Sequence, residues 1–233
     1  MGFWSSVGSA FSSACSAISS ACSSIGSAIS GACSSLLGSL GSVASNLAPV
    51  LSALAVVIPT AGVLGKISLA IEVLSVVLGL LDKDEKLEDM GDKAIQAKEA
   101  GINPEDFATY KEYAEAIKNF EVDPKKSKEL SSTEKMVAGL GVMAWGMEEN
   151  FGMGASDIII KTAKSPDFFT GERLTAYLDK VESIKDVVAY FDNKLSKSER
   201  LIVEEKLVEA EKTLNPDKST LAIYQGLSKN TED

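Results

Sequence analysis

The sequence predicts an all-α protein in three parts: a long Ser/Ala/Gly-rich amphipathic helix, a hydrophobic helical hairpin and an acidic domain of several helices. Three observations predict this class. Apolar residues recur at alternating steps of three and four near the N-terminus, two long apolar runs follow, and the rest of the chain repeats helix-start signals with few strand signals. We place the three parts at residues 1–47, 48–81 and 82–233.

The first part is built on a seven-residue repeat. Its units are WSSVGSA from Trp4, FSSACSA from Phe11, ISSACSS from Ile18 and IGSAISG from Ile25. Strict heptad spacing predicts one helix over 3–47 whose apolar face needs a partner helix. The other positions hold Ser, Ala and Gly, where a soluble coiled coil has Glu and Lys, and small residues let helices pack closely in lipid. We therefore expect a homo-oligomer.

The second part is interpreted as two apolar helices joined at a turn from Pro59 to Gly62. Residues 36–58 carry no charged side chain and residues 63–81 carry two. Both runs are close to the roughly 20 residues that a helix needs to cross about 30 Å of hydrocarbon. The alternative is a buried pair of helices around which charged helices pack in water.

Lys66 and Glu72 are the two charged residues of the hairpin and of the whole chain before Asp82. Lys66 lies close enough to the turn to extend its ammonium group to a membrane interface. Glu72 would lie near the middle of a bilayer, at a cost of about 2.5–3.5 kcal/mol on insertion scales. Glu72 therefore needs protonation, a partner or an aqueous lumen.

The third part holds the other 22 basic and 32 acidic residues, so the net charge of −10 lies there. Asn103-Pro104 and Asp123-Pro124 are helix-start signals, and Ser131 to Glu134 and Ser196 to Glu199 match the capping box. We expect a helix start, rather than a strand, at Ser156-Asp157. The apolar residues between Met136 and Met147 are interpreted as core.

Several function classes are excluded by composition. Nucleic-acid binding needs concentrated Lys or Arg, and this chain is acidic with two arginines. It has no histidine, so catalysis through a histidine base is excluded. Cys15, Cys22 and Cys33 lack zinc-site spacing and are interpreted as packing residues, and the neighbours Glu148 and Glu149 as surface charge. We expect a protein that is not an enzyme and uses no metal or cofactor.

The uncharged region is the candidate functional element, as a membrane pore. In one arrangement its apolar face (Trp4, Phe11, Ile18, Ile25) and the hairpin (Pro59, Gly62) face lipid, and its small residues (Ser16, Ser23, Ser30, Gly26) line a wet lumen or a close helix contact. Helices with so many small residues accommodate either packing, so the sequence leaves open which face lines the lumen. Serine hydroxyls offer dipoles without fixed charge, and a ring formed by Glu72 of each subunit would favour cations. Lys66 would mark the membrane surface.

FSSACSA and ISSACSS resemble the designed leucine–serine peptides that assemble into helical channels. The whole plan, with no signal-peptide pattern, resembles the small pore-forming antibacterial effectors of the type VI secretion system. That resemblance implies secretion without a signal peptide, insertion into the inner membrane of a target cell, depolarisation, and a cognate immunity protein. An exposed apolar hairpin would aggregate before delivery, so we also expect a soluble state in which the acidic domain, a carrier ring or self-association shields it. Pore-forming colicins share the apolar hairpin but carry it at the C-terminal end of the toxin domain.

Two other hypotheses about the function remain open. In the first, the heptads and the hairpin form a self-assembling scaffold, which predicts soluble oligomers without membrane affinity. In the second, the hairpin anchors an acidic adaptor domain to a membrane, so deletion of residues 3–47 would leave its localisation unchanged but would abolish a pore.

Overall fold

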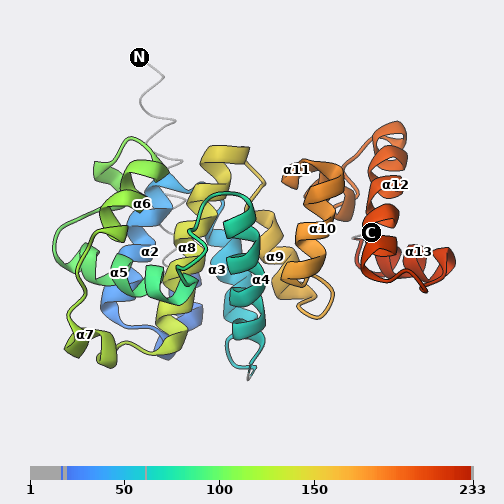
Figure 1. The fold of residues 1–233 in the computed structure, drawn as a ribbon. Helices are drawn as coiled ribbons and strands as arrows, with labels where there is room; N and C mark the ends of the chain where they lie inside the picture. The colour runs from blue at the N-terminus through green and yellow to red at the C-terminus, as the bar shows by residue number, and fades with distance from the viewer. Residues whose placement is uncertain (1–16, 18–19, 61, 232–233) are drawn as a thin grey trace, which may run out of the picture.

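The computed structural model describes residue 17 and residues 20–60 and 62–231 (Figure 1). Within those residues the regular elements are all helices, and none is a strand. The predicted all-α class is thereby confirmed.

The described residues of the apolar N-terminal region form short helices rather than long ones. These are the 3₁₀ turn η1 (Gly26–Ala28), α2 (Gly31–Val43), α3 (Leu47–Val57) and α4 (Val63–Val77). The single helix expected over 3–47 is therefore interrupted in the described residues. Gly26 adopts a positive φ of 49°. Ser30 begins α2, and its hydroxyl accepts a hydrogen bond from the Cys33 N–H at 3.3 Å. Ser and Gly are weak helix formers that favour turns and caps, so apolar spacing alone did not keep the helix continuous.

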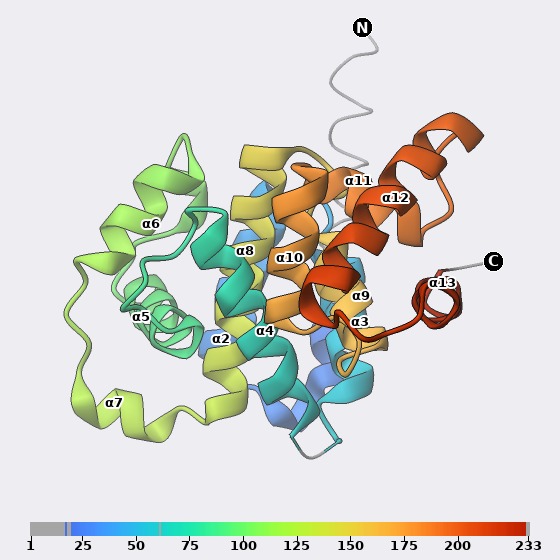
Figure 2. The same ribbon diagram turned by 45° about the vertical axis from the view of Figure 1, so that its right-hand side comes forward.

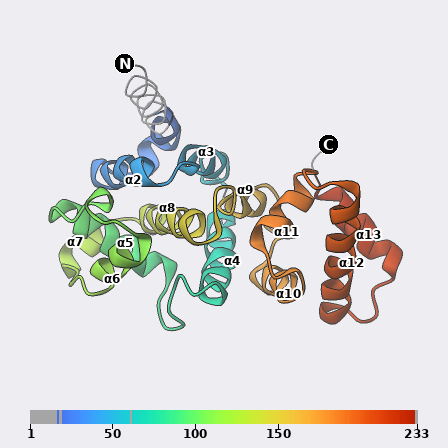
Figure 3. The same ribbon diagram turned by 90° about the horizontal axis from the view of Figure 1, so that it is seen from above.

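Helix α8 (Ser132–Phe151) lies at the centre of the N-terminal half of the molecule. Every residue from Val137 to Met147 is buried, and a helix that is apolar on all sides needs neighbours on all sides. Those neighbours are α2, α3, α4 and α5 (Leu87–Glu99), which surround α8 in Figure 3. The expected core role of this stretch is confirmed, with Met136 half-buried at its edge.

Glycines bring α5 and α8 into close contact. A Cβ at Gly139 of α8 would clash with the carbonyl oxygen of Leu87, and a Cβ at Gly91 of α5 would clash with that of Lys135. The two backbones therefore touch directly, which no other residue type would permit without a shift.

The remaining elements lie on two sides of this centre. On the side of α5 are η2 (Pro104–Asp106), α6 (Tyr110–Lys118) and α7 (Pro124–Glu129). On the other side are α9 (Asp157–Lys164), α10 (Gly171–Val181), α11 (Ile184–Phe191), α12 (Lys197–Leu214) and α13 (Thr220–Lys229). Helix α4 joins the two sides, because it packs on α8, α9 and α10, as Figure 2 shows.

Most of the predicted start signals are used as expected. The capping boxes at Ser131 and Ser196 begin α8 and α12, Asp123 caps α7, and Ser156 precedes α9. Asn103-Pro104 begins only the short turn η2. Buried apolar side chains from Ala21 to Leu227 form one connected core, to which the segments 1–47, 48–81 and 82–233 all contribute.

Candidate functional site

Helices α2 to α4 are held in the fold by burial of their apolar faces. Their fully buried side chains include Leu36, Leu37, Leu40, Leu47, Leu51, Leu54, Ile67 and Leu74. At about 1.5–3 kcal/mol for each buried Leu or Ile, this burial is the main stabilising contribution of the segment. The structure therefore matches the interpretation of the hairpin as buried core helices, with charged helices packed around them.

Glu134 connects the start of α2 to the start of α8. Its Oε1 accepts a hydrogen bond from the Ser30 N–H at 2.7 Å, and its Oε2 accepts one from the Ser131 N–H at 2.8 Å. Burial opposes ionisation, but the hydrogen bonds from Ser30 and Ser131 outweigh it and hold the pKa of Glu134 below its ordinary value. A charged carboxylate thus caps the first turn of a helix that has no charge of its own.

Glu148 connects the start of α3 to the end of α8. Its two carboxylate oxygens accept hydrogen bonds from the Ser45 and Asn46 N–H groups, each at 2.9 Å, and its Oε1 also accepts one from the Ser156 hydroxyl at 3.0 Å. The neighbouring Glu149 accepts the Tyr110 N–H on both oxygens at 2.9 Å and so caps α6. The two residues interpreted as surface charge are therefore both helix caps.

These contacts set the direction of α2. Glu134 and Glu148 are about 21 Å apart along α8, and the 13 residues of α2 span about 20 Å at 1.5 Å per residue. Because the two ends of α2 meet these two carboxylates, α2 runs parallel to α8. Helix α3 then returns toward the end of the bundle where α8 begins (Figure 1).

Glu72 and Lys66 also have partners in this state. Glu72 is half-buried, and its Oε2 accepts the Leu87 N–H at 2.9 Å, which caps α5. Lys66 is exposed and pairs with Asp167 at 2.6 Å. An exposed ion pair of this kind contributes little to stability, at most about 1 kcal/mol.

The other predicted pore residues are not gathered at one place. Pro59 and Gly62 lie exposed in the turn between α3 and α4, and Gly62 has a positive φ of 79°. Ile25 is buried, whereas Ser23, Gly26 and Ser30 are exposed. Trp4, Phe11, Ser16 and Ile18 lie outside the described residues. Pro49 lies in the first turn of α3, where its missing N–H costs nothing.

In the described part of the chain, no helix combines the length and the apolar character needed to cross a bilayer. The run 36–58, expected as one spanning arm, is divided between α2 and α3. Some apolar surface remains exposed on these helices, with Val56 of α3 at 77% and Leu69 of α4 at 61%.

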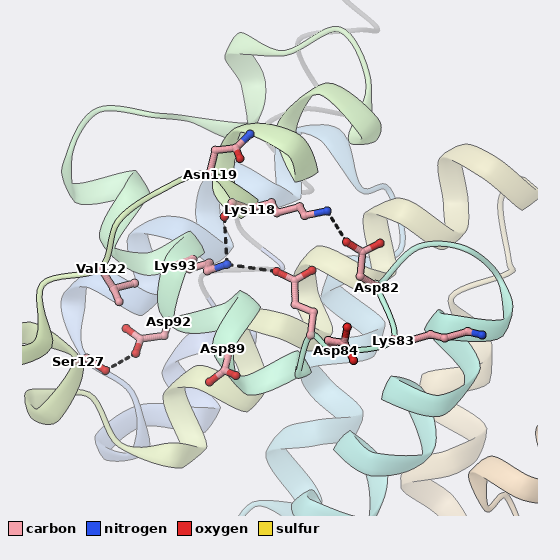
Figure 4. Close-up of a pocket in the computed structure, with 11 residues that line it drawn as sticks. Asp82, Lys83, Asp84, Asp89, Asp92, Lys93, Lys118, Asn119, Val122 and Ser127 are labelled. Carbon is pink, nitrogen blue, oxygen red and sulfur yellow. Dashed lines mark hydrogen bonds and ion pairs between the residues drawn. The ribbon is translucent and has the colours of Figure 1, made fainter.

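A hollow of about 770 Å³ lies elsewhere, between the segment that precedes α5 and the helices α5, α6 and α7 (Figure 4). Two of its lysines form ion pairs with acidic lining residues: Lys93 with Glu85 at 3.3 Å, and Lys118 with Asp82. Burial raises the pKa of Asp92, but hydrogen bonds from Ser127, Lys135 and Gln96 lower it by more, with a net decrease. Among the described residues no group of three or more acidic or cysteine side chains could hold a metal ion.

Burial raises the thiol pKa of both cysteines that the structure describes, Cys22 and Cys33. Cys33 is fully buried in the core, and burial raises its pKa to about 12, so the thiol stays protonated at neutral pH. Cys22 is half-buried and its pKa is also raised by burial. Cys15 lies outside the described residues.

Sequence reasoning missed Glu148 as the residue that positions α3. Its partners are more than 100 residues away in the chain, and no local pattern connects them. The one available signal was the pair Ser45-Asn46, two residues that favour helix starts, in the middle of an apolar run. Comparisons with family models, with curated proteins and with solved structures give no match to this chain.

Proposed function

We propose that this chain is a pore-forming protein that inserts its uncharged N-terminal region into a lipid bilayer, assembles with further copies and conducts cations. The observation that carries the proposal is the absence of any charged side chain from Met1 to Gly65. A water-soluble helix bundle normally carries charged side chains at its exposed positions, so it does not need a long uncharged segment. A segment that enters a bilayer does need to be uncharged, because each charge in hydrocarbon costs several kcal/mol.

The folded structure supports the proposal, because it has the features expected of a shielded state before insertion. Helices α2 to α4 bury their leucines in the core, and the charges at the starts of α2 and α3 are supplied by Glu134 and Glu148. Glu134 and Glu148 belong to the acidic part of the chain, so α2 and α3 could leave without carrying either carboxylate into the membrane. Leucine loses little on transfer from a protein core to lipid, since both surroundings are apolar.

Selectivity for cations is proposed for Glu72. It is the one acidic residue before Asp82 and would form a ring of carboxylates in an oligomer. In the shielded state the same carboxylate caps α5, so the residue would exchange a backbone partner for a wet lumen.

The biology proposed with this activity is that of an antibacterial effector that depolarises the inner membrane of a target cell. Its partners would be a carrier ring for secretion and a cognate immunity protein. No enzymatic step is proposed.

The test is the current across a voltage-clamped planar bilayer under a KCl gradient, with the wild type, Glu72→Gln and Lys66→Gln. We expect stepwise currents from all three and a reversal potential that moves toward zero only in Glu72→Gln. Glu72→Gln also removes a cap in the folded protein, but the reversal potential is independent of how much protein inserts. Currents from the wild type with an unchanged reversal potential in Glu72→Gln would contradict the role of Glu72.

Two results would replace the proposal. A silent bilayer to which the protein binds would indicate a membrane-anchored adaptor. Soluble oligomers without bilayer binding would indicate a scaffold.

A further inference from the structure

The connection between α2 and α3 is a break in an otherwise uncharged helical sequence. Helix α2 ends at Val43 and α3 begins at Leu47, and the last hydrogen bond of α2 runs from the Ala44 N–H to the Leu40 carbonyl at 2.8 Å. The next two amides, Ser45 and Asn46, are the ones that Glu148 accepts.

Those two amides decide whether the helix stops or continues. In a continuous helix they would donate to the carbonyls of Gly41 and Ser42, four residues earlier. Glu148 therefore competes directly with helix continuation. A charged acceptor with two oxygens forms stronger hydrogen bonds than a backbone carbonyl, which favours the break.

Further contacts hold the junction in this conformation. The Asn46 side-chain amide donates to the Ser156 hydroxyl oxygen at 3.0 Å and to the carboxylate of Asp157, and Ser156 in turn donates to Glu148. Ser156 is fully buried. The acceptors of this network lie at the end of α8 and the start of α9, outside the uncharged segment.

We infer that Glu148 is a latch: it keeps α2 and α3 as two short antiparallel helices, and loss of its hydrogen bonds allows residues 31–57 to form one continuous helix. No residue of that range carries a charged side chain. At 1.5 Å per residue the helix would be about 40 Å long, enough to cross about 30 Å of hydrocarbon, with a kink at Pro49. This inference rests on the proposed insertion, because water gives the long helix no apolar partner.

The test uses the full chain as wild type, Glu148→Gln and Glu149→Gln. Glutamine keeps the shape of the side chain, but it has one acceptor oxygen, and its NH₂ group would face one of the two backbone donors. Glu149→Gln removes the same charge one residue later, where the carboxylate caps α6 rather than α3. Amide hydrogen exchange is followed in peptides covering residues 43–47, in solution and with phosphatidylcholine/phosphatidylglycerol vesicles.

In solution we expect the Ser45 and Asn46 amides to exchange about tenfold faster in Glu148→Gln, and at the wild-type rate in Glu149→Gln. With vesicles we expect more Glu148→Gln than wild type to bind, and the same amides to become protected in the bound protein. If the amides of α8 exchange faster by the same factor as those of Ser45 and Asn46, the latch is overturned, because Glu148→Gln would then act through general unfolding.

The two proposals fail in different ways. Vesicle binding with unprotected Ser45 and Asn46 amides would overturn the continuous helix and leave insertion standing. If wild type, Glu148→Gln and Glu149→Gln neither bind vesicles nor carry current across a bilayer, the proposed function and the latch are both overturned.

Discussion

The N-terminal helices α2 to α4 and the C-terminal helices α10 to α13 differ in how their first turns are satisfied. Each C-terminal helix is capped by its own serine or threonine: Thr170, Ser183, Ser196 and Ser219. Among the N-terminal helices only α2 has such a cap, at Ser30, and α3 and α4 begin without a side-chain cap from Asn46 or Gly62. Helices α2 and α3 depend on distant carboxylates as well.

This difference shows which part of the chain has its conformation encoded locally. A helix with its own cap and its own charged face starts at the same residue in many surroundings. A helix that is capped from another part of the molecule keeps its ends only while that contact lasts. The starts of α10–α13 are therefore encoded locally, whereas the starts of α2 and α3 depend on tertiary contacts.

The largest expected effect comes from the buried acid of the C-terminal region. Glu211 is 1% exposed and accepts hydrogen bonds from Arg173 at 2.5 Å, Tyr177 at 2.8 Å and Lys218 at 3.1 Å. Glu211→Ala leaves these donors without their acceptor and should cost about 3–5 kcal/mol. Hydrogen exchange should accelerate in α10 and α12 and stay unchanged in α2. Equal acceleration in α2 would show that the two regions unfold as one unit and would break the comparison.

A smaller effect is expected at the capping boxes of α8, which contacts the start of α2, and of α12 in the C-terminal region. Glu134 and Glu199 each complete a capping box, but only Glu134 is buried and also accepts the Ser30 N–H of another helix. Glu134→Gln should lower the free energy of unfolding by about 1.5–3 kcal/mol at pH 7, as for a hydrogen bond to a charged group. Glu199→Gln, in an exposed and local box, should have the smaller effect. Urea unfolding of both variants checks this.

The contribution of Glu134 to the free energy of unfolding depends on pH, and the direction of its pKa shift fixes the sign of this dependence. The pKa of Glu134 is lowered from its ordinary value of 4.5 in the folded state, so its contribution is present above pH 4.5 and lost as the pH falls through the folded pKa. The difference between wild type and Glu134→Gln should therefore shrink in acid. A difference that is constant between pH 7 and pH 3 would contradict the assignment of the charge to this cap.

The smallest effect is expected when one helical glycine in each region is replaced by alanine. A Cβ at Gly38 of α2 would meet nothing within 4 Å, and one at Gly226 of α13 would meet only ordinary contacts near 3.9 Å. Gly→Ala at either helical position should stabilise the protein by about 0.5–1 kcal/mol. Thermal unfolding measures both. A gain at Gly226 without one at Gly38 would show that α2 is not a persistent helix in water.

The sequence by itself determined the all-α class, the starts of α7, α8, α9 and α12, the buried character of Val137 to Met147 and the uncharged nature of the chain from Met1 to Gly65. These features depend on local spacing and on residues close in the chain, which periodicity and capping patterns report.

Only the tertiary structure decided where the uncharged region breaks and what each carboxylate does. The stops at Gly26 and Ala44, the caps provided by Glu134 and Glu148, and the contact of Glu72 with Leu87 were not predicted. Heptad spacing is satisfied equally by one long helix or by two short ones, and the intrinsic preferences conflict, because Ala favours a helix whereas Ser and Gly favour caps and turns. The choice is made by hydrogen-bond partners about 100 residues away, and they become neighbours only when the chain has folded.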